Sequence, residues 1–138
     1  MNEELSILHV EDDELDAEAL RRSMKKRGLE AELTWVTDGA KALDYLRQAD
    51  ASQLRALVVL LDLNMPRVSG HEFLEKLRNE LRLSKAVVFV VTSSEHRRDI
   101  ALAYEQNVAG YFHKDKVEEL VEILKRYQSG AHLPQLGA

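Results

Sequence analysis

The order of apolar and polar residues along the chain alternates between short apolar runs and longer stretches of mixed polarity. The apolar runs predict five strands, at 5–10, 31–36, 56–61, 86–91 and 109–112. The longer stretches predict five helices, at 14–27, 38–48, 70–81, 95–107 and 117–128. Gly28 is placed to end the first helix and Asp38 to cap the second. Regular alternation of strand and helix is typical of an α/β fold.

The runs at 56–61 and 86–91 contain no polar side chain, which fits strands buried on both faces of a parallel sheet. The run at 31–36 alternates and includes Thr34, so we expect it at a sheet edge. Because crossovers between parallel strands are right-handed, these elements predict a doubly wound five-stranded parallel sheet. Residues 1–129 are expected to form this one domain, followed by a C-terminal tail at 130–138.

Polar residues follow the apolar runs directly, at the strand ends where a doubly wound sheet has its ligand crevice. They are Glu11 and Asp12, then Asp62, Thr92 and Lys114. Asp62 ends the apolar run at 56–61, and an unpaired carboxylate beside such a core is costly unless a cation or chemistry occupies it. The convergence of these residues predicts one acidic pocket at one edge of the sheet.

Several carboxylates in one pocket repel one another, and a divalent cation relieves that repulsion. The chain has no cysteine and no histidine beside these acids, so hard oxygen ligands favour Mg²⁺ or Mn²⁺ over zinc. Asp62 is a candidate nucleophile, since carboxylates form aspartyl-phosphate intermediates. Lys114 would then supply compensating charge, and the Thr92 hydroxyl could donate to a phosphoryl oxygen.

Composition and net charge limit the kinds of molecule that we expect the chain to bind. The chain has 138 residues and a formal net charge of −5, which argues against nucleic acid as a direct partner. No apolar stretch reaches the ~20 residues that a membrane helix needs. The acidic start at 1–4 argues against a secretory signal, and the absence of cysteine weakly favours the cytoplasm. We therefore expect a cytoplasmic protein that binds neither nucleic acid nor membrane.

Four motifs in order resemble the receiver domain of two-component response regulators. Glu11 and Asp12 lie in a segment similar to the family's acidic signature, and 61–66 with Ser69-Gly70 is similar to its phosphoacceptor loop. Val91-Thr92-Ser93 resembles the hydroxyl switch, and Gly110-Tyr111 with Lys114 resembles the switch aromatic and active-site lysine. The gaps of thirty residues from Asp62 to Thr92 and twenty-two from Thr92 to Lys114 match the family's spacing.

This resemblance implies a flavodoxin-like strand order of 2-1-3-4-5 and a phosphoryl group accepted on Asp62 from a histidine kinase. Asp12, Asp62 and the backbone carbonyl of Asn64 would ligate Mg²⁺, and Glu11 would act through a water. The chemistry would be limited to Mg²⁺-dependent self-phosphorylation and slow autodephosphorylation, so the protein would not be an enzyme in the usual sense.

The resemblance also implies how the phosphoryl group is held and sensed. Thr92 and Lys114 would hold its oxygens, and Tyr111 would change rotamer as Thr92 moves. Asn64 and Ser94, each two residues past a key position, would tune hydrolysis. A small movement at the site could thus bias a two-state surface.

Two departures from the usual receiver pattern are visible. The family usually has a proline after the lysine, where this chain has Asp115, so the loop geometry after the fifth strand is open. The segment 49–55 is longer than in compact receivers, as in the phytochrome-associated, stand-alone, single-domain subgroup. A bacterial phytochrome is accordingly one candidate for the kinase.

Other functions fit less well. An Mg²⁺-dependent aspartyl-phosphate phosphatase generally needs a second acid two residues after the nucleophile, where this chain has Asn64. An FMN carrier needs a loop of amide donors after the first strand, where this chain has acids. A pseudo-receiver scaffold would not need the complete set of acids, Thr92 and Lys114. A phosphorelay intermediate stays open beside the terminal regulator.

The last predicted helix has more apolar surface than one buried face requires. Ile123 and Tyr127 extend its stripe sideways, and we expect them, with Leu102 and Tyr111, to form a homodimer interface through the helix at 95–107, the strand at 109–112 and the helix at 117–128. Alternatively, Leu133 and Leu136 of the tail could cover this surplus.

Overall fold

The computed structural model describes residues 4–129, so the tail at 130–138 and its two leucines lie outside the described residues. The elements are, in chain order, β1 (Leu5–Val10), α1 (Glu14–Lys26), β2 (Ala31–Val36), α2 (Gly39–Gln48), α3 (Ala51–Leu54), β3 (Leu57–Leu61), α4 (Gly70–Asn79), β4 (Val87–Thr92), α5 (Arg97–Glu105), β5 (Gly110–His113) and α6 (Val117–Ser129). A 3₁₀ turn, Lys114–Lys116, joins β5 to α6. None of the helices in the described part could cross a membrane.

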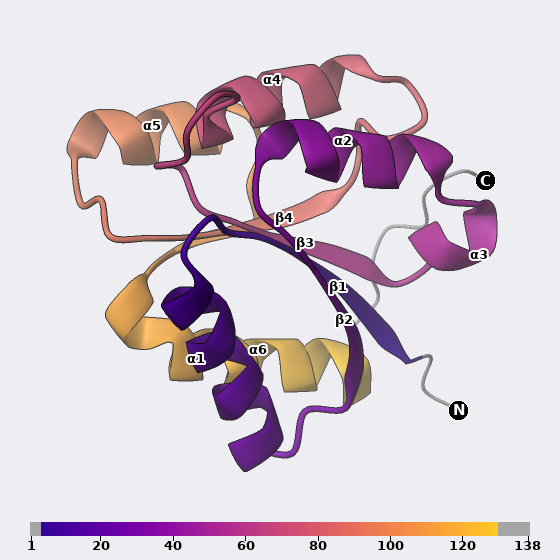
Figure 1. Cartoon of the computed structure of the whole chain (residues 1–138), viewed down its shortest axis with the longest axis vertical. Helices are drawn as coiled ribbons and strands as arrows, with labels where there is room; N and C mark the ends of the chain where they lie inside the picture. The colour runs from indigo at the N-terminus through magenta and orange to yellow at the C-terminus, as the bar shows by residue number, and fades with distance from the viewer. Residues whose placement is uncertain (1–3, 130–138) are drawn as a thin grey trace.

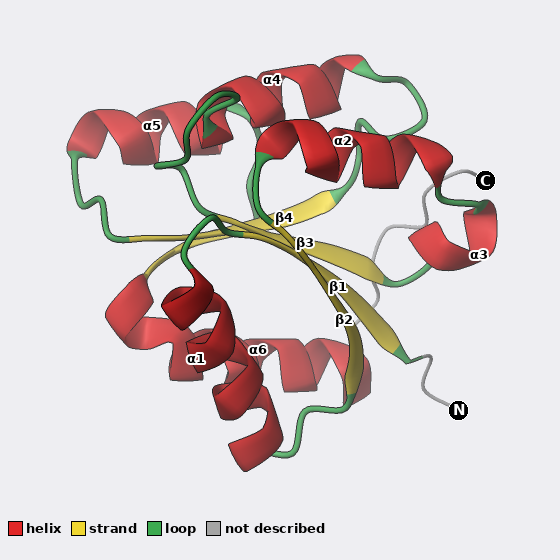
Figure 2. Cartoon of the chain, viewed as in Figure 1, coloured by secondary structure: helices red, strands yellow, loops and turns green. Residues whose placement is uncertain are grey.

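The five strands form one parallel sheet in the order β2-β1-β3-β4-β5, which confirms the predicted fold class and strand order. β2 lies at an edge, as its mixed pattern predicted. Helices α1 and α6 cover one face of the sheet, and α2, α4 and α5 cover the other, giving three layers (Figures 1 and 2). The carboxyl ends of β1, β3 and β4 therefore meet at one edge of the sheet.

The central strand β3 divides the core into two clusters. All five of its residues are buried. Val58 and Leu60 pack with the cluster under α1 and α6, whereas Val59 and Leu61 pack with the cluster under α2 and α4. Since successive side chains of a strand point to opposite faces, an unbroken apolar run is what a strand between two helical layers requires.

Local signals set most helix ends where the sequence placed them. The Asp13 side chain caps α1 by accepting from the backbone N–H groups of Leu15 and Asp16, and Asp38 caps α2 as predicted. Gly28 follows α1 with a φ of 72°, the left-handed conformation that a helix-ending glycine supplies.

One short helix was not predicted, and two predicted helices are shorter than expected. The segment 49–55 contains the short helix α3, which a capping box between Asp50 and Gln53 begins. The helix expected at 70–81 ends at Asn79, and the one expected at 95–107 spans only Arg97–Glu105. Leu81 is 96% exposed, so this apolar residue continues no buried stripe.

Candidate functional site

The carboxyl edge of the sheet brings the predicted polar residues together. Glu11 and Asp12 follow β1, Asp62 follows β3, Thr92 ends β4, and Lys114 follows β5. One carboxylate oxygen from each of Glu11, Asp12 and Asp62 lies within 4.8 Å of the others. Asp12 is exposed while Glu11 and Asp62 are buried, so the cluster opens to solvent on the Asp12 side.

Donors from three separate segments hold the carboxylate of Asp62. Its Oδ1 accepts from the Thr92 hydroxyl at 2.8 Å and from the backbone N–H of Asn64 at 3.2 Å. Its Oδ2 lies 3.2 Å from the Lys114 ammonium. The side chain is only 3% exposed, so its orientation is fixed by these contacts rather than by water.

Lys114 makes ion pairs with three carboxylates. Its Nζ lies 2.5 Å from Asp16 Oδ2, 3.1 Å from Glu11 Oε1 and 3.2 Å from Asp62 Oδ2. Burial alone would lower the pKa of Lys114, but the acids around it outweigh that effect and raise it. Lys114 is therefore charged in the pocket at any physiological pH.

The sequence prediction did not include Asp16 in this pocket, where it makes the shortest contact to Lys114. Asp16 lies in the first turn of α1, where an acid is also favoured by the helix dipole, so its residue type and position did not indicate a contact to Lys114.

Glu11 is an acid whose ionisation the pocket opposes. Burial, and then the charge of Asp62, raise the pKa of Glu11 to about 8, although the Asp13 N–H and Lys114 oppose the shift. Three hard-oxygen groups in close approach, one of them reluctant to ionise, fit a divalent cation that would offset their repulsion. Glu11, Asp12 and Asp62 are the acids close enough together to hold one; their division into direct ligands and a water-linked one, and the Asn64 carbonyl as a ligand, stay predictions.

A chain of hydrogen bonds connects the Thr92 loop to α4, α5 and β5. The half-buried Tyr111 donates its hydroxyl to the Ser94 carbonyl at 2.9 Å. The Ser94 hydroxyl donates to Asp99 at 2.5 Å, and the other Asp99 oxygen lies 3.0 Å from His71 Nε2. The sequence named no partner for His71 and did not single out Asp99. Twenty-eight residues separate them, and only the packing of α4 against α5 reveals the pair.

The loop after Asp62 is packed against the start of α4. A side chain at Gly70 would place its first carbon 2.5 Å from the Leu63 Cα and 2.7 Å from the Asp62 carbonyl oxygen. The Gly70 N–H donates to the Leu63 carbonyl at 3.1 Å. Gly70 therefore permits a close approach that fixes the backbone beside Asp62.

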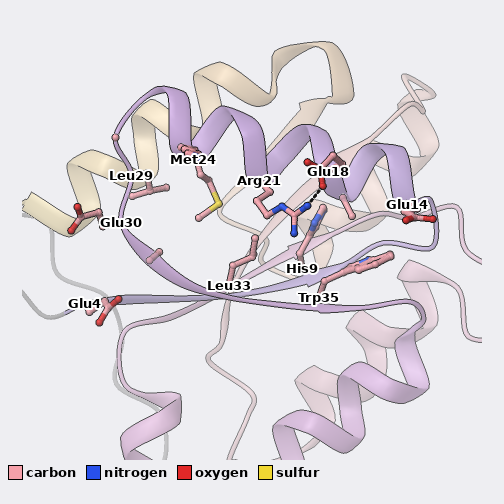
Figure 3. A pocket seen from close by; sticks show the side chains of 14 residues that line it. Glu4, His9, Glu14, Glu18, Arg21, Met24, Leu29, Glu30, Leu33 and Trp35 are labelled. Carbon is pink, nitrogen blue, oxygen red and sulfur yellow. Dashed lines mark hydrogen bonds and ion pairs between the residues drawn. The ribbon is translucent and has the colours of Figure 1, made fainter.

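His9 and Trp35 line a groove next to the acidic pocket, and His9 also lines a smaller pocket with Glu11, Asp16 and Lys114. His9 is buried, which lowers its pKa to about 4. It lies in a groove between α1 and β2 (Figure 3). The volume of this groove is about 820 Å³. Trp35 also lines this groove, and its indole N–H donates to the Glu11 carbonyl at 2.7 Å.

All four predicted interface residues are half-buried: Leu102, Tyr111, Ile123 and Tyr127. Ile123 and Tyr127 pack in part against the core under α1 and α6, and the Tyr127 ring meets Phe89 edge-on at 6.0 Å between centroids. The protein's own core thus covers part of the apolar surface of the last helix that the sequence analysis assigned to a homodimer interface.

Known proteins share this architecture. The model of the response regulator receiver domain matches residues 7–125. The chain is 36% identical over 130 residues to the probable methanogenesis regulatory protein FilR2 of Methanothrix harundinacea, covering 90% of this chain and 83% of that protein. The Mn²⁺-bound structure of response regulator Rcp1, a protein of Synechocystis sp., has 28% identity and a TM-score of 0.78 over 94% of this chain and 99% of that one. The phosphorylated cyanobacterial phytochrome response regulator RcpA has 27% identity and a TM-score of 0.79, over 96% and 99%.

Proposed function

Because this chain belongs to the family of response regulator receiver domains, we propose that Asp62 accepts a phosphoryl group from a histidine kinase in a Mg²⁺-dependent reaction. The observation that carries the proposal is the environment of Asp62. A buried carboxylate faces a hydroxyl on one oxygen and an ammonium on the other, beside two further acids. This arrangement supplies a nucleophile, donors for phosphoryl oxygens and ligands for a cation.

The transfer follows from these positions. An Asp62 oxygen attacks phosphorus, the new P–O bond forms as the P–N bond to the kinase histidine breaks, and the bond pair leaves with the imidazole. Asp12 and Asp62 would hold Mg²⁺, which when bound offsets the charge of the phosphoryl oxygens. Thr92 turns its hydroxyl from Asp62 Oδ1 to a phosphoryl oxygen, and Lys114 pairs with another.

The lifetime of the acyl phosphate depends on the residues that face it. Asn64 stands two residues after Asp62, where a phosphatase of this kind has a second acid, so no carboxylate there protonates a leaving group or activates water. Ser94 is held by Asp99 and accepts from Tyr111. The slow hydrolysis that we expect from these residues fits a signalling role better than that of a phosphatase, and a phosphorelay intermediate is the second candidate.

The likeness to RcpA, which is a phytochrome response regulator, makes a phytochrome-type histidine kinase in the cytoplasm the proposed phosphodonor. We further propose that the signal leaves through a homodimer surface on α5, β5 and α6. Tyr111 lies in β5 on that surface and contacts the backbone of the Thr92 loop, which links phosphorylation to the surface.

Acetyl phosphate and Mg²⁺ test the phosphoacceptor directly. Mass spectrometry of the wild type should show one adduct that is stable in acid and labile in base, and Asp62→Asn should show none. Asp13→Asn is the matched control, because it removes an exposed acid that follows Asp12 directly in the chain, while asparagine keeps the helix cap. Equal aspartyl labelling of Asp62→Asn would refute the assignment.

A further inference from the structure

Asp16 makes the shortest of the three contacts to the active-site lysine, yet it belongs to neither the metal cluster nor the phosphoryl-binding set. It lies in the first turn of α1, and its Oδ2 is 2.5 Å from Lys114 Nζ. Ninety-eight residues separate the two, so this ion pair joins the start of α1 to the end of β5.

The ammonium of Lys114 is shared among three acids before any phosphoryl group is present. It has three hydrogens, and three carboxylates surround it, those of Asp16, Glu11 and Asp62. Phosphorylation of Asp62 removes the charge of that carboxylate and attaches a more negative group to it, so the phosphoryl oxygens compete with Asp16 and Glu11 for the ammonium.

Exposure decides which contact is exchanged. The side chain of Glu11 is 1% exposed and that of Asp16 is 35% exposed. A buried carboxyl group that loses its polar partner, whether ionised or protonated, costs more than a carboxylate that water can solvate. Asp16 is therefore the group that Lys114 can leave most cheaply.

We propose that Asp16 is a positioning residue that competes with the phosphoryl group for Lys114 and ties α1 to the end of β5 in the unphosphorylated protein. The inference rests on the proposed phosphorylation of Asp62. When Lys114 turns to the phosphoryl oxygen, the α1 end of this tie is released. At the other end of α1, Arg27 pairs with Glu118 and Glu122 of α6, so α1 stays anchored there while its first turn is freed.

Beryllofluoride, a stable mimic of the phosphoryl group, measures this competition without turnover. Titration calorimetry of the full chain with excess Mg²⁺ should show that Asp16→Asn and Asp16→Ala bind beryllofluoride about threefold tighter than the wild type, as expected for loss of one partly exposed ion pair. Asp16→Glu, which keeps the competing carboxylate, should stay close to the wild type.

The matched control is Glu14→Gln, which removes an exposed acid two residues away that makes no ion pair with Lys114 among those described. If Glu14→Gln tightens binding as much as Asp16→Asn, general charge explains the effect and the inference is overturned. Unchanged or weaker binding by both Asp16 variants overturns it too. A wild type that binds no beryllofluoride would instead count against the proposed function.

Discussion

Glu11→Gln is expected to remove a pH dependence from the stability of the metal-free protein. The folded state raises the pKa of Glu11 from 4.5 to about 8, so folded Glu11 keeps a proton that the unfolded chain releases. Between these values the folded state binds more protons than the unfolded state, and the free energy of unfolding falls as pH rises. The contribution of Glu11 is full below pH 4.5 and is lost as pH rises toward 8.

The size of the effect follows from the width of this window. Each pH unit is worth about 1.4 kcal/mol, so at most about 3 kcal/mol is lost between pH 4.5 and 7. Glutamine has nearly the shape of a protonated glutamate and cannot ionise. The variant should therefore match the wild type near pH 5 and exceed its unfolding free energy by up to about 3 kcal/mol at pH 7.

Urea unfolding followed by far-UV circular dichroism, with EDTA present and at several pH values from 5 to 8, measures this difference. Titrating groups outside the acidic pocket contribute equally to both proteins and cancel. Glu14→Gln, at an exposed position, serves as the control. Added Mg²⁺ should stabilise the wild type most at high pH, where the cation no longer competes with a proton. A difference that is constant with pH, or a variant less stable than the wild type at pH 8, would refute the reasoning.

Two further predictions concern the loop and the surface. Gly70→Ala should lower the free energy of unfolding by about 3 kcal/mol and slow labelling of Asp62, because the added carbon meets the Leu63 backbone. Urea titration measures the first effect and acetyl phosphate labelling the second; an unchanged unfolding free energy and labelling rate would contradict the close approach. Sedimentation at micromolar concentration should show a dimer that Ile123→Asp or Tyr127→Asp weakens, whereas a monomer at every concentration, with and without beryllofluoride, would exclude the surface on α5, β5 and α6.

The sequence predicted the acidic pocket because its residues lie at strand ends, and parallel strands bring those ends to one edge whatever the details of packing. Asp62 and Thr92 are thirty residues apart, yet each directly follows or ends an apolar run, and their hydrogen bond follows from the pairing of β3 with β4. The spacing of apolar runs is a property of the chain, so it could be used without a structure.

The contacts that the sequence missed depend on the rotation of helices. Asp16 faces Lys114, and Asp99 faces Ser94 and His71, only because α1, α4 and α5 lie on the sheet at particular angles. A charged residue on a helix has the same pattern whether it faces solvent or a neighbouring strand end. Such pairs can be found only from the three-dimensional structure. Helix α3 could have been predicted only by giving the capping box of Asp50 and Gln53 more weight than the expectation of a loop.

The hydrogen bond from Trp35 to Glu11 gives this molecule a built-in optical reporter. Trp35 is the only tryptophan in the chain, and its indole is 42% exposed while its N–H is bonded to the Glu11 carbonyl. That carbonyl belongs to the peptide unit that joins Glu11 to Asp12, the two acids that follow β1. Indole emission depends on the hydrogen bond and polarity at its nitrogen, so a cation that pulls on Glu11 and Asp12 alters the environment of a single fluorophore. Cation occupancy can therefore be followed by intrinsic fluorescence in the unlabelled protein.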